Sequence, residues 1–236
     1  MLRKILTVAI LAGFCAGLII SVVQEFTTTP YILHAEEYEN AGVNSFDGIT
    51  NAKFIQASVI LIDSGHGDGE AWGPSDGMER SIFTALSNVI TGIGFALLLV
   101  AAFALYGRET SGRTGIIWGI AGFAAFALAP ALGLAPELPG MMAADLVARQ
   151  GWWIMTAIAT VAGLALMAFG QSWVWRIVGI VALAAPHIIG APHPESIGSA
   201  VPPELASHFV AASLVTAAVF WATLGWFAGT FWSRQS

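Results

Sequence analysis

The sequence predicts an all-α integral membrane protein, a polytopic bundle of six transmembrane helices with a small outer N-terminal loop domain. The first observation is composition: 56% of the 236 residues are apolar, only 10% are charged, and the mean hydropathy is +0.74. Such a chain is too apolar for an ordinary soluble domain. The second is that the apolar residues form long runs, and backbone groups in hydrocarbon must be paired within the segment or in a closed barrel. The whole chain, residues 1–236, is therefore treated as one membrane domain.

Six apolar runs are long enough to cross a bilayer, and none alternates as a barrel strand does. The predicted spans cover residues 5–23, 82–106, 114–135, 152–169, 173–191 and 206–231. The first run exceeds the usual signal-peptide core of about 7 to 15 residues, so we expect an uncleaved anchor. The fifth run is the least regular, because Arg176 lies just inside it and Pro186 near its end. An arrangement with five spans is the alternative.

The region between the first two spans, residues 24–80, is predicted to lie outside the membrane and is too small for a large core of its own. Tyr31 to Asn40 has the composition of a short helix carrying three glutamates, whereas residues 64–77 form a glycine-rich loop. Two further outer loops, 133–150 and 190–204, are rich in Pro and Gly, which favours rigid turns.

The basic residues near the span ends set the orientation. With a cytoplasmic N-terminus, the inner side holds six of them: Arg3, Lys4, Arg108, Arg113, Arg176 and Arg234. The outer side holds three: Lys53, Arg80 and Arg149. Both termini are therefore predicted to be cytoplasmic. Fourteen of the fifteen carboxylates then lie outside, all but Glu109, and the net charge of −6 belongs to a surface that attracts cations.

The acidic balance gives no reason to expect a nucleic-acid partner, and the sequence gives no sign of an enzyme. The inner connections, residues 107–113 and 170–172, are too short to hold a nucleotide-binding domain, and no phosphate-cradling glycine motif is present. Any energy source for transport must therefore lie in another chain or in an ion gradient.

Small and polar residues mark faces inside the spans. Gly115 and Gly119, and likewise Gly225 and Gly229, have the spacing that lets two helix backbones approach. Four polar residues share one face of the second span, namely Thr84, Ser87, Asn88 and Thr91. That face is either a polar path or a set of interhelical hydrogen bonds.

All five histidines fall on the predicted outer side, together with most carboxylates. His66, Asp68 and Glu70 alternate along the glycine-rich loop, and His187 follows Pro186 at a membrane boundary. His193 and His208 flank a short loop that contains Glu195 and Glu204. Imidazole and carboxylate together suit a divalent transition metal. Each residue also has a plainer explanation, as a solvated loop residue or as a hydrogen-bonded interfacial histidine.

The segment before the second span is expected to have a structural or gating role. Asp76, Glu79 and Arg80 precede the apolar run by less than two helical turns. Acidic residues favour a helix start, so these side chains are predicted to cap and position the second span.

Several strings taken together resemble a known family. They are WGPSDGMER at 72–80, LAPALGLAPELPG at 128–140, ARQGWW at 148–153, GAPHP at 190–194 and FW at 220–221. In order and spacing they are similar to the CbtA family of predicted cobalt transporter subunits, over essentially the whole chain. The resemblance implies a bacterial cytoplasmic-membrane protein linked to cobalamin-related cobalt uptake and to CbtB, a small single-span partner. The resemblance also implies a functional role for six residues: His66, Asp76, Glu79, Arg80, Glu137 and His193.

The two lines of argument give one hypothesis. The chain is a membrane subunit that receives cobalt(II) or another divalent cation outside and passes it inward, with no permanently bound cofactor. His66, His193 and Glu137 are expected to converge at the outer mouth, with His187 as the next ligand inward. Nickel and zinc accept the same ligands, so the metal's identity rests on the resemblance alone.

Two other functions stay open, as does association of several copies of the chain. One is a non-transporting subunit that handles metal or assists assembly. The other is a haem-holding anchor of an oxidoreductase, which would need paired axial histidines within the bundle.

Overall fold

The computed structural model describes residues 1–46, 74–75, 77–194 and 199–235. Within these ranges the chain is helical, and the only sheet-like pairing is an isolated antiparallel bridge between Met141 and Ser199. The predicted all-α fold is confirmed.

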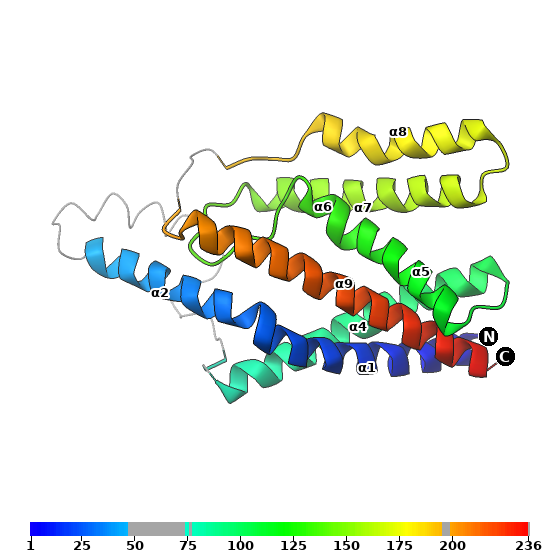
Figure 1. Cartoon of the computed structure of the whole chain (residues 1–236), viewed down its shortest axis with the longest axis horizontal. Helices are drawn as coiled ribbons and strands as arrows, with labels where there is room; N and C mark the ends of the chain where they lie inside the picture. The colour runs from blue at the N-terminus through cyan, green and yellow to red at the C-terminus, as the bar shows by residue number, and fades with distance from the viewer. Residues whose placement is uncertain (47–73, 76, 195–198, 236) are drawn as a thin grey trace.

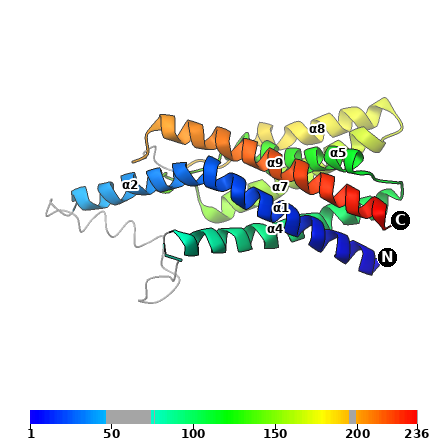
Figure 2. The ribbon, with the colours of Figure 1, turned by 60° about the horizontal axis from the view of Figure 1, so that its bottom comes forward.

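The helices run back and forth along one axis (Figure 1). In chain order they are α1 (Leu2–Thr27), α2 (Thr29–Phe46), α4 (Met78–Tyr106), α5 (Gly112–Phe123), the π-helix η1 (Ala124–Leu128), α6 (Ala129–Ala131), α7 (Leu146–Phe169), α8 (Trp173–Ile189) and α9 (Pro203–Arg234). α5, η1 and α6 form one continuous pass, and α2 continues α1 beyond the bundle. The two termini lie at the same end in both views (Figures 1 and 2).

Among the described residues, five helices are long and apolar enough to cross a membrane: α1, α4, the pass Gly112–Ala131, α7 and α9. The chain is thus a multi-pass membrane protein. The predicted span 173–191 corresponds to α8, an apolar helix of 17 residues and about 25 Å, short of a hydrocarbon core of about 30 Å. The described residues therefore give five candidate spans, which is the arrangement that the sequence analysis left as the alternative to six. α8 is a shorter antiparallel neighbour of α7.

The observed helices extend beyond most of the predicted spans. α7 begins at Leu146 instead of 152, since the Asp145 carboxylate accepts a hydrogen bond from the Ala148 amide at 2.9 Å. In the region 24–80, α1 continues to Thr27 and the expected short helix is part of α2. The outer region thus begins as helix rather than as loop.

The helices approach one another through glycines. A Cβ on Gly115 would overlap the carbonyl oxygen of Gly225, and one on Gly229 would overlap that of Ser111. The two predicted motifs therefore contact each other, and they join α5 to α9. Close approach also joins α7 to α8, where a Cβ on Gly163 would lie 2.7 Å from the carbonyl oxygen of Gly179. Such contacts replace the hydrophobic driving force that lipid removes.

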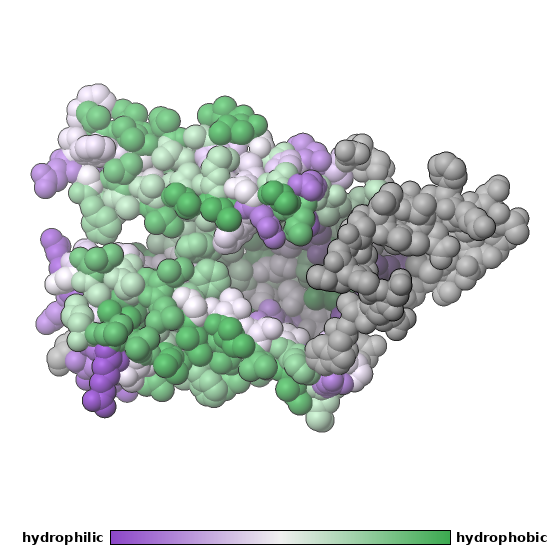
Figure 3. Space-filling view, turned by 180° about the vertical axis from the view of Figure 1, so that it is seen from behind, coloured by the Kyte–Doolittle hydropathy of each residue, from purple (hydrophilic) through white to green (hydrophobic). Residues whose placement is uncertain are grey.

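Two clusters of buried side chains hold the rest together. The larger cluster joins α1, α4 and α9 and includes Val8, Phe103 and Leu224. The smaller one, Ala35, Leu138, Val201 and Phe209, joins α2 to both outer loops and to the start of α9. We call these segments the outer layer. Apolar residues cover the length of the bundle and hydrophilic residues gather at its ends (Figure 3), as expected when lipid surrounds the middle.

The α5–α9 contact gives a stability prediction. Gly115→Ala places a methyl group against backbone atoms that cannot move aside, so the free energy of unfolding should fall by about 1 to 3 kcal/mol. Gly94→Ala is the control, because no heavy atom lies within 4 Å of its added Cβ. Thermal unfolding of both variants in detergent measures the difference. Equal unfolding midpoints of the two variants would show that the close α5–α9 contact is not needed for stability.

Candidate functional site

The four described histidines lie at the end of the bundle opposite the termini. His34 is on α2, His187 is in the last turn of α8, and His193 follows in the outer loop. His208 is near the start of α9, where its ring lies 6.3 Å from that of Tyr31. The one-sided gathering expected from the sequence is thus observed for these four, and His66 lies outside the described residues.

Two predicted ligands, Glu137 and His187, are linked through the start of α7. Arg149 donates a hydrogen bond to the Glu137 carboxylate at 2.6 Å, and both side chains are about 30% exposed. One turn further along α7, the Trp152 ring meets the His187 ring edge-on, with centroids 5.9 Å apart. We call Glu137, Arg149, Trp152 and His187 the outer α7 site.

The outer loops converge on this site. A Cβ on Gly133 would overlap the Trp152 ring and would lie 2.9 Å from the Cβ of Ala191. Gly133 therefore allows the loop after α6, the start of α7 and the loop after α8 to meet. Trp152 is only 6% exposed and fills this junction.

Unpaired polar atoms continue inward along the same face of α7. Three buried atoms have no hydrogen-bond partner among the described residues: Arg149 Nε, Trp152 Nε1 and Thr156 Oγ1. Thr160, which is 3% exposed, donates its hydroxyl to the carbonyl of Thr156 at 2.7 Å. Spacings of three, four and four residues place all four side chains on one helix face. Each buried unpaired group costs about 1 to 3 kcal/mol, which favours a bound polar species here.

The structure does not bring together all the residues that the sequence singled out. The described residues contain no group of three His, Cys, Asp or Glu side chains that could hold a metal ion. His193 is exposed, and Asp76, like His66, lies outside the described ranges. The convergence of His66, His193, Glu137 and His187 on one ion therefore stays a prediction. Sequence inspection missed Arg149 and Thr156, although their helical spacing with Trp152 was a usable signal.

Glu79 and Arg80 each bond a neighbouring segment at the start of α4. Glu79 lies in the first turn of α4 and accepts hydrogen bonds from the Ser75 amide, at 3.2 Å, and from the Ser75 hydroxyl. Arg80 forms a two-point ion pair with Glu36 of α2, one bond being 3.0 Å long. The bonded guanidinium holds the pKa of Glu36 below its usual value of 4.5, against the opposing effect of burial. This pair ties the outer helix to the second span.

The polar face of α4 is partly explained by interhelical bonding. The Asn88 amide donates to the Ser21 hydroxyl at 3.0 Å and to the Gln24 side-chain oxygen at 2.6 Å, both on α1. Ser87 and Thr91 are exposed on the bundle surface. Around Asn88, interhelical hydrogen bonding accounts for the polar residues.

The fold and the site define a polytopic helical membrane protein with an acidic, histidine-bearing outer layer above a polar helix face. Comparison with family models assigns the chain: it belongs to the CbtA family, described as "Probable cobalt transporter subunit (CbtA)", and the match covers residues 2–233. No curated protein and no solved structure matches significantly. Family membership favours a transporter subunit over the metal-handling and haem-anchor alternatives, and it makes cobalt the probable transported substrate.

The Arg80–Glu36 pair gives a pH prediction. The pKa of Glu36 is lowered in the folded state, so the ion pair stabilises the protein above pH 4.5. This stabilisation is lost as the pH falls through the folded-state pKa of Glu36. Glu36→Gln should cost about 0.2 to 1 kcal/mol at neutral pH and progressively less in acid. Thermal unfolding across pH measures this, with the exposed Glu37→Gln as control. If the loss of stability caused by Glu36→Gln did not become smaller in acid, the ion pair could not be its source.

Proposed function

We propose that this chain takes up cobalt(II) from the outer side and passes it inward along α7. One observation carries the proposal: unpaired polar atoms continue inward along α7 from the outer α7 site. A protein surrounded by lipid has no reason to bury such groups unless they meet water, an ion or a partner.

The outer ligands in this proposal are His187 and Glu137, joined by His193 and His66 from the loops. Glu137 uses one carboxylate oxygen for Arg149, and its other oxygen bonds no described residue. An imidazole with a carboxylate oxygen suits cobalt(II). Pro- and Gly-stiffened loops reduce the ordering cost of bringing several ligands to one ion.

Below the ligands, the ion is proposed to travel with part of its water shell. Ion-bound water can accept a hydrogen bond from the Trp152 indole and exchange bonds with the Thr156 hydroxyl. Thr160 lies eleven residues after Arg149, about 16 Å along the helix. At the inner end, the Phe169 ring lies 5.8 Å from that of Tyr106 and 6.3 Å from that of Trp118. These apolar rings are proposed to close the route at rest.

The proposed location is the bacterial cytoplasmic membrane, with both termini cytoplasmic and α8 crossing as a sixth span. The position of the termini at one end supports this, because an odd number of crossings would separate them. The basic residues expected inside lie on elements that meet at that end, and Lys4 sits 4.1 Å from the Trp232 ring centroid there.

The partner is proposed to be a small single-span CbtB-like subunit, and the physiological role to be cobalt supply for cobalamin. The family description as a subunit implies a partner. α8 packs on α7 and leaves much of its apolar surface free, including Ile177, Ile180 and Val181, which are 48% to 60% exposed. A single membrane helix could associate along that surface.

Topology can be tested with single cysteines in a Cys15→Ala background. If α8 crosses, Ser199→Cys is labelled by an impermeant reagent in intact cells, whereas Gln171→Cys and Glu109→Cys are labelled only after permeabilisation. All three positions are exposed. Protection of Ser199→Cys in intact cells, with labelling after permeabilisation, would show that α8 does not cross, because Gln171 follows α7 and lies inside in either case.

The metal ligands can be tested by cobalt uptake. His187→Ala and His193→Ala should raise the half-saturating cobalt concentration by about tenfold or more, since even indirect changes at metal sites have effects of that size. Uptake should recover at abundant cobalt. His34→Ala is the matched control, because this exposed histidine packs on Tyr38 of the same helix, with ring centroids 5.3 Å apart. If both variant proteins are present at normal abundance and take up cobalt like the parent at limiting cobalt concentrations, the proposed role of these histidines as metal ligands is refuted.

A further inference from the structure

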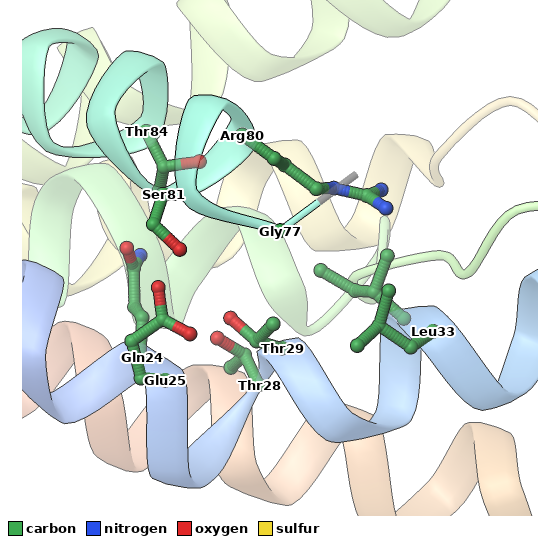
Figure 4. A pocket seen from close by; sticks show the side chains of 10 residues that line it. Gln24, Glu25, Thr28, Thr29, Leu33, Gly77, Arg80, Ser81 and Thr84 are labelled. Carbon is green, nitrogen blue, oxygen red and sulfur yellow. The ribbon is translucent and has the colours of Figure 1, made fainter. Parts of the chain in front are cut away.

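A second polar site lies between the α1–α2 junction and the start of α4. A cavity of about 210 Å³ opens there, away from the outer α7 site (Figure 4). Seven of its ten lining residues are polar, and the side chains with oxygen atoms are Gln24, Glu25, Thr28, Thr29, Ser81 and Thr84. Arg80, Ile32, Leu33 and Gly77 complete it. Neither the family description nor the proposed metal route uses Glu25 or Thr28.

Thr28 is the residue that indicates a ligand. It is only 8% exposed, it lines the cavity, and its hydroxyl bonds no residue that the structure describes. Figure 4 shows the Thr28 and Thr29 hydroxyls directed into the cavity beside the Glu25 carboxylate, with the Ser81 hydroxyl facing that carboxylate from α4. Because this hydroxyl bonds no described residue and faces the cavity, it is available to an occupant.

The helix break adds to this environment. α1 ends at Thr27 and α2 begins at Thr29, so the regular helix is interrupted at Thr28, which lines the cavity. Pro30 has no amide hydrogen, so it cannot give the carbonyl of Phe26 its usual helical bond. Broken helices whose C-terminal ends meet an ion are a recurrent device of membrane transporters.

The chemistry of the lining selects the kind of ion. Among the described residues, the lining offers oxygen ligands and contains no His or Cys. The Arg80 guanidinium is paired with Glu36, and the remaining acidic side chain of this lining is that of Glu25. Hydroxyl, amide and carboxylate oxygens suit hard cations, and a single charge balances a monovalent one. A transition metal would prefer the imidazoles elsewhere in the outer layer.

We propose that this cavity binds a sodium ion, held by Glu25, Thr28 and the neighbouring hydroxyls. Binding does not depend on the proposed cobalt route, because it is measurable with no cobalt present. The site joins α1, α2 and α4, so its occupation stabilises the folded chain.

The test uses the full chain, purified in detergent, with sodium chloride exchanged for choline chloride at constant chloride concentration. Sodium should raise the midpoint of thermal unfolding in a saturable way, and choline should not. Glu25→Gln and Thr28→Val should each raise the half-saturating sodium concentration by about tenfold, the effect of losing one good ligand. Glu37→Gln, an exposed glutamate on α2 that does not line the cavity, should respond like the parent.

Thr28→Val keeps the experiment decisive even if Glu25→Gln fails to fold. Its hydroxyl makes no bond to a described residue, so the near-isosteric valine should fold like the parent. An equal response to sodium and choline, or parent-like titrations of both cavity variants, overturns the proposal. Stabilisation by cobalt(II) that both variants abolish, without any response to sodium, also overturns it and assigns the cavity to the transported metal.

Discussion

Close contact between helix backbones is the constraint on which the rest of this structure depends. Lipid chains are as apolar as leucine, so burying apolar side chains between helices gains little, and packing must supply the attraction. Gly115 and Gly225 let α5 and α9 touch along their backbones, and Gly163 and Gly179 do the same for α7 and α8. Between α1 and α4 the same device recurs at Gly13, which faces the backbone of Ile93. Helix pairs formed in this way are rigid enough to carry a polar site between them.

The outer α7 site lies where one such pair meets the others. The α7–α8 pair is joined to the bundle at its outer end by Trp152 on Gly133, and by the Trp153 ring 6.1 Å from that of Phe126 in η1. η1 is a π-helix that precedes the buried Pro130, and such irregular turns recur at functional sites. The polar atoms of α7 therefore face a joint between rigid units rather than the interior of one of them.

Hydropathy and charge placement were enough to predict the helical class, the approximate spans and the common location of the four described histidines. The glycine motifs of α5 and α9 were also visible, because their spacing is local. The contacts that build the sites were not. Arg80 pairs with Glu36 from 44 residues away, and the cavity beside Thr28 exists only because α4 returns to the α1–α2 junction. Such contacts depend on how distant segments meet, and no periodicity within one helix encodes them.

α9 packs against α1, although it follows every other described helix in the sequence. α9 shares a buried core with α1 and α4, and near the outer end of α1 the Thr27 and Thr216 hydroxyls lie 2.9 Å apart in a hydrogen bond. The glycine face of α5 meets the glycines of α9, so this face is without its partner until α9 has been made. The earlier helices must therefore wait in the bilayer for α9, and a chain that stops before it leaves the glycine face of α5 uncovered.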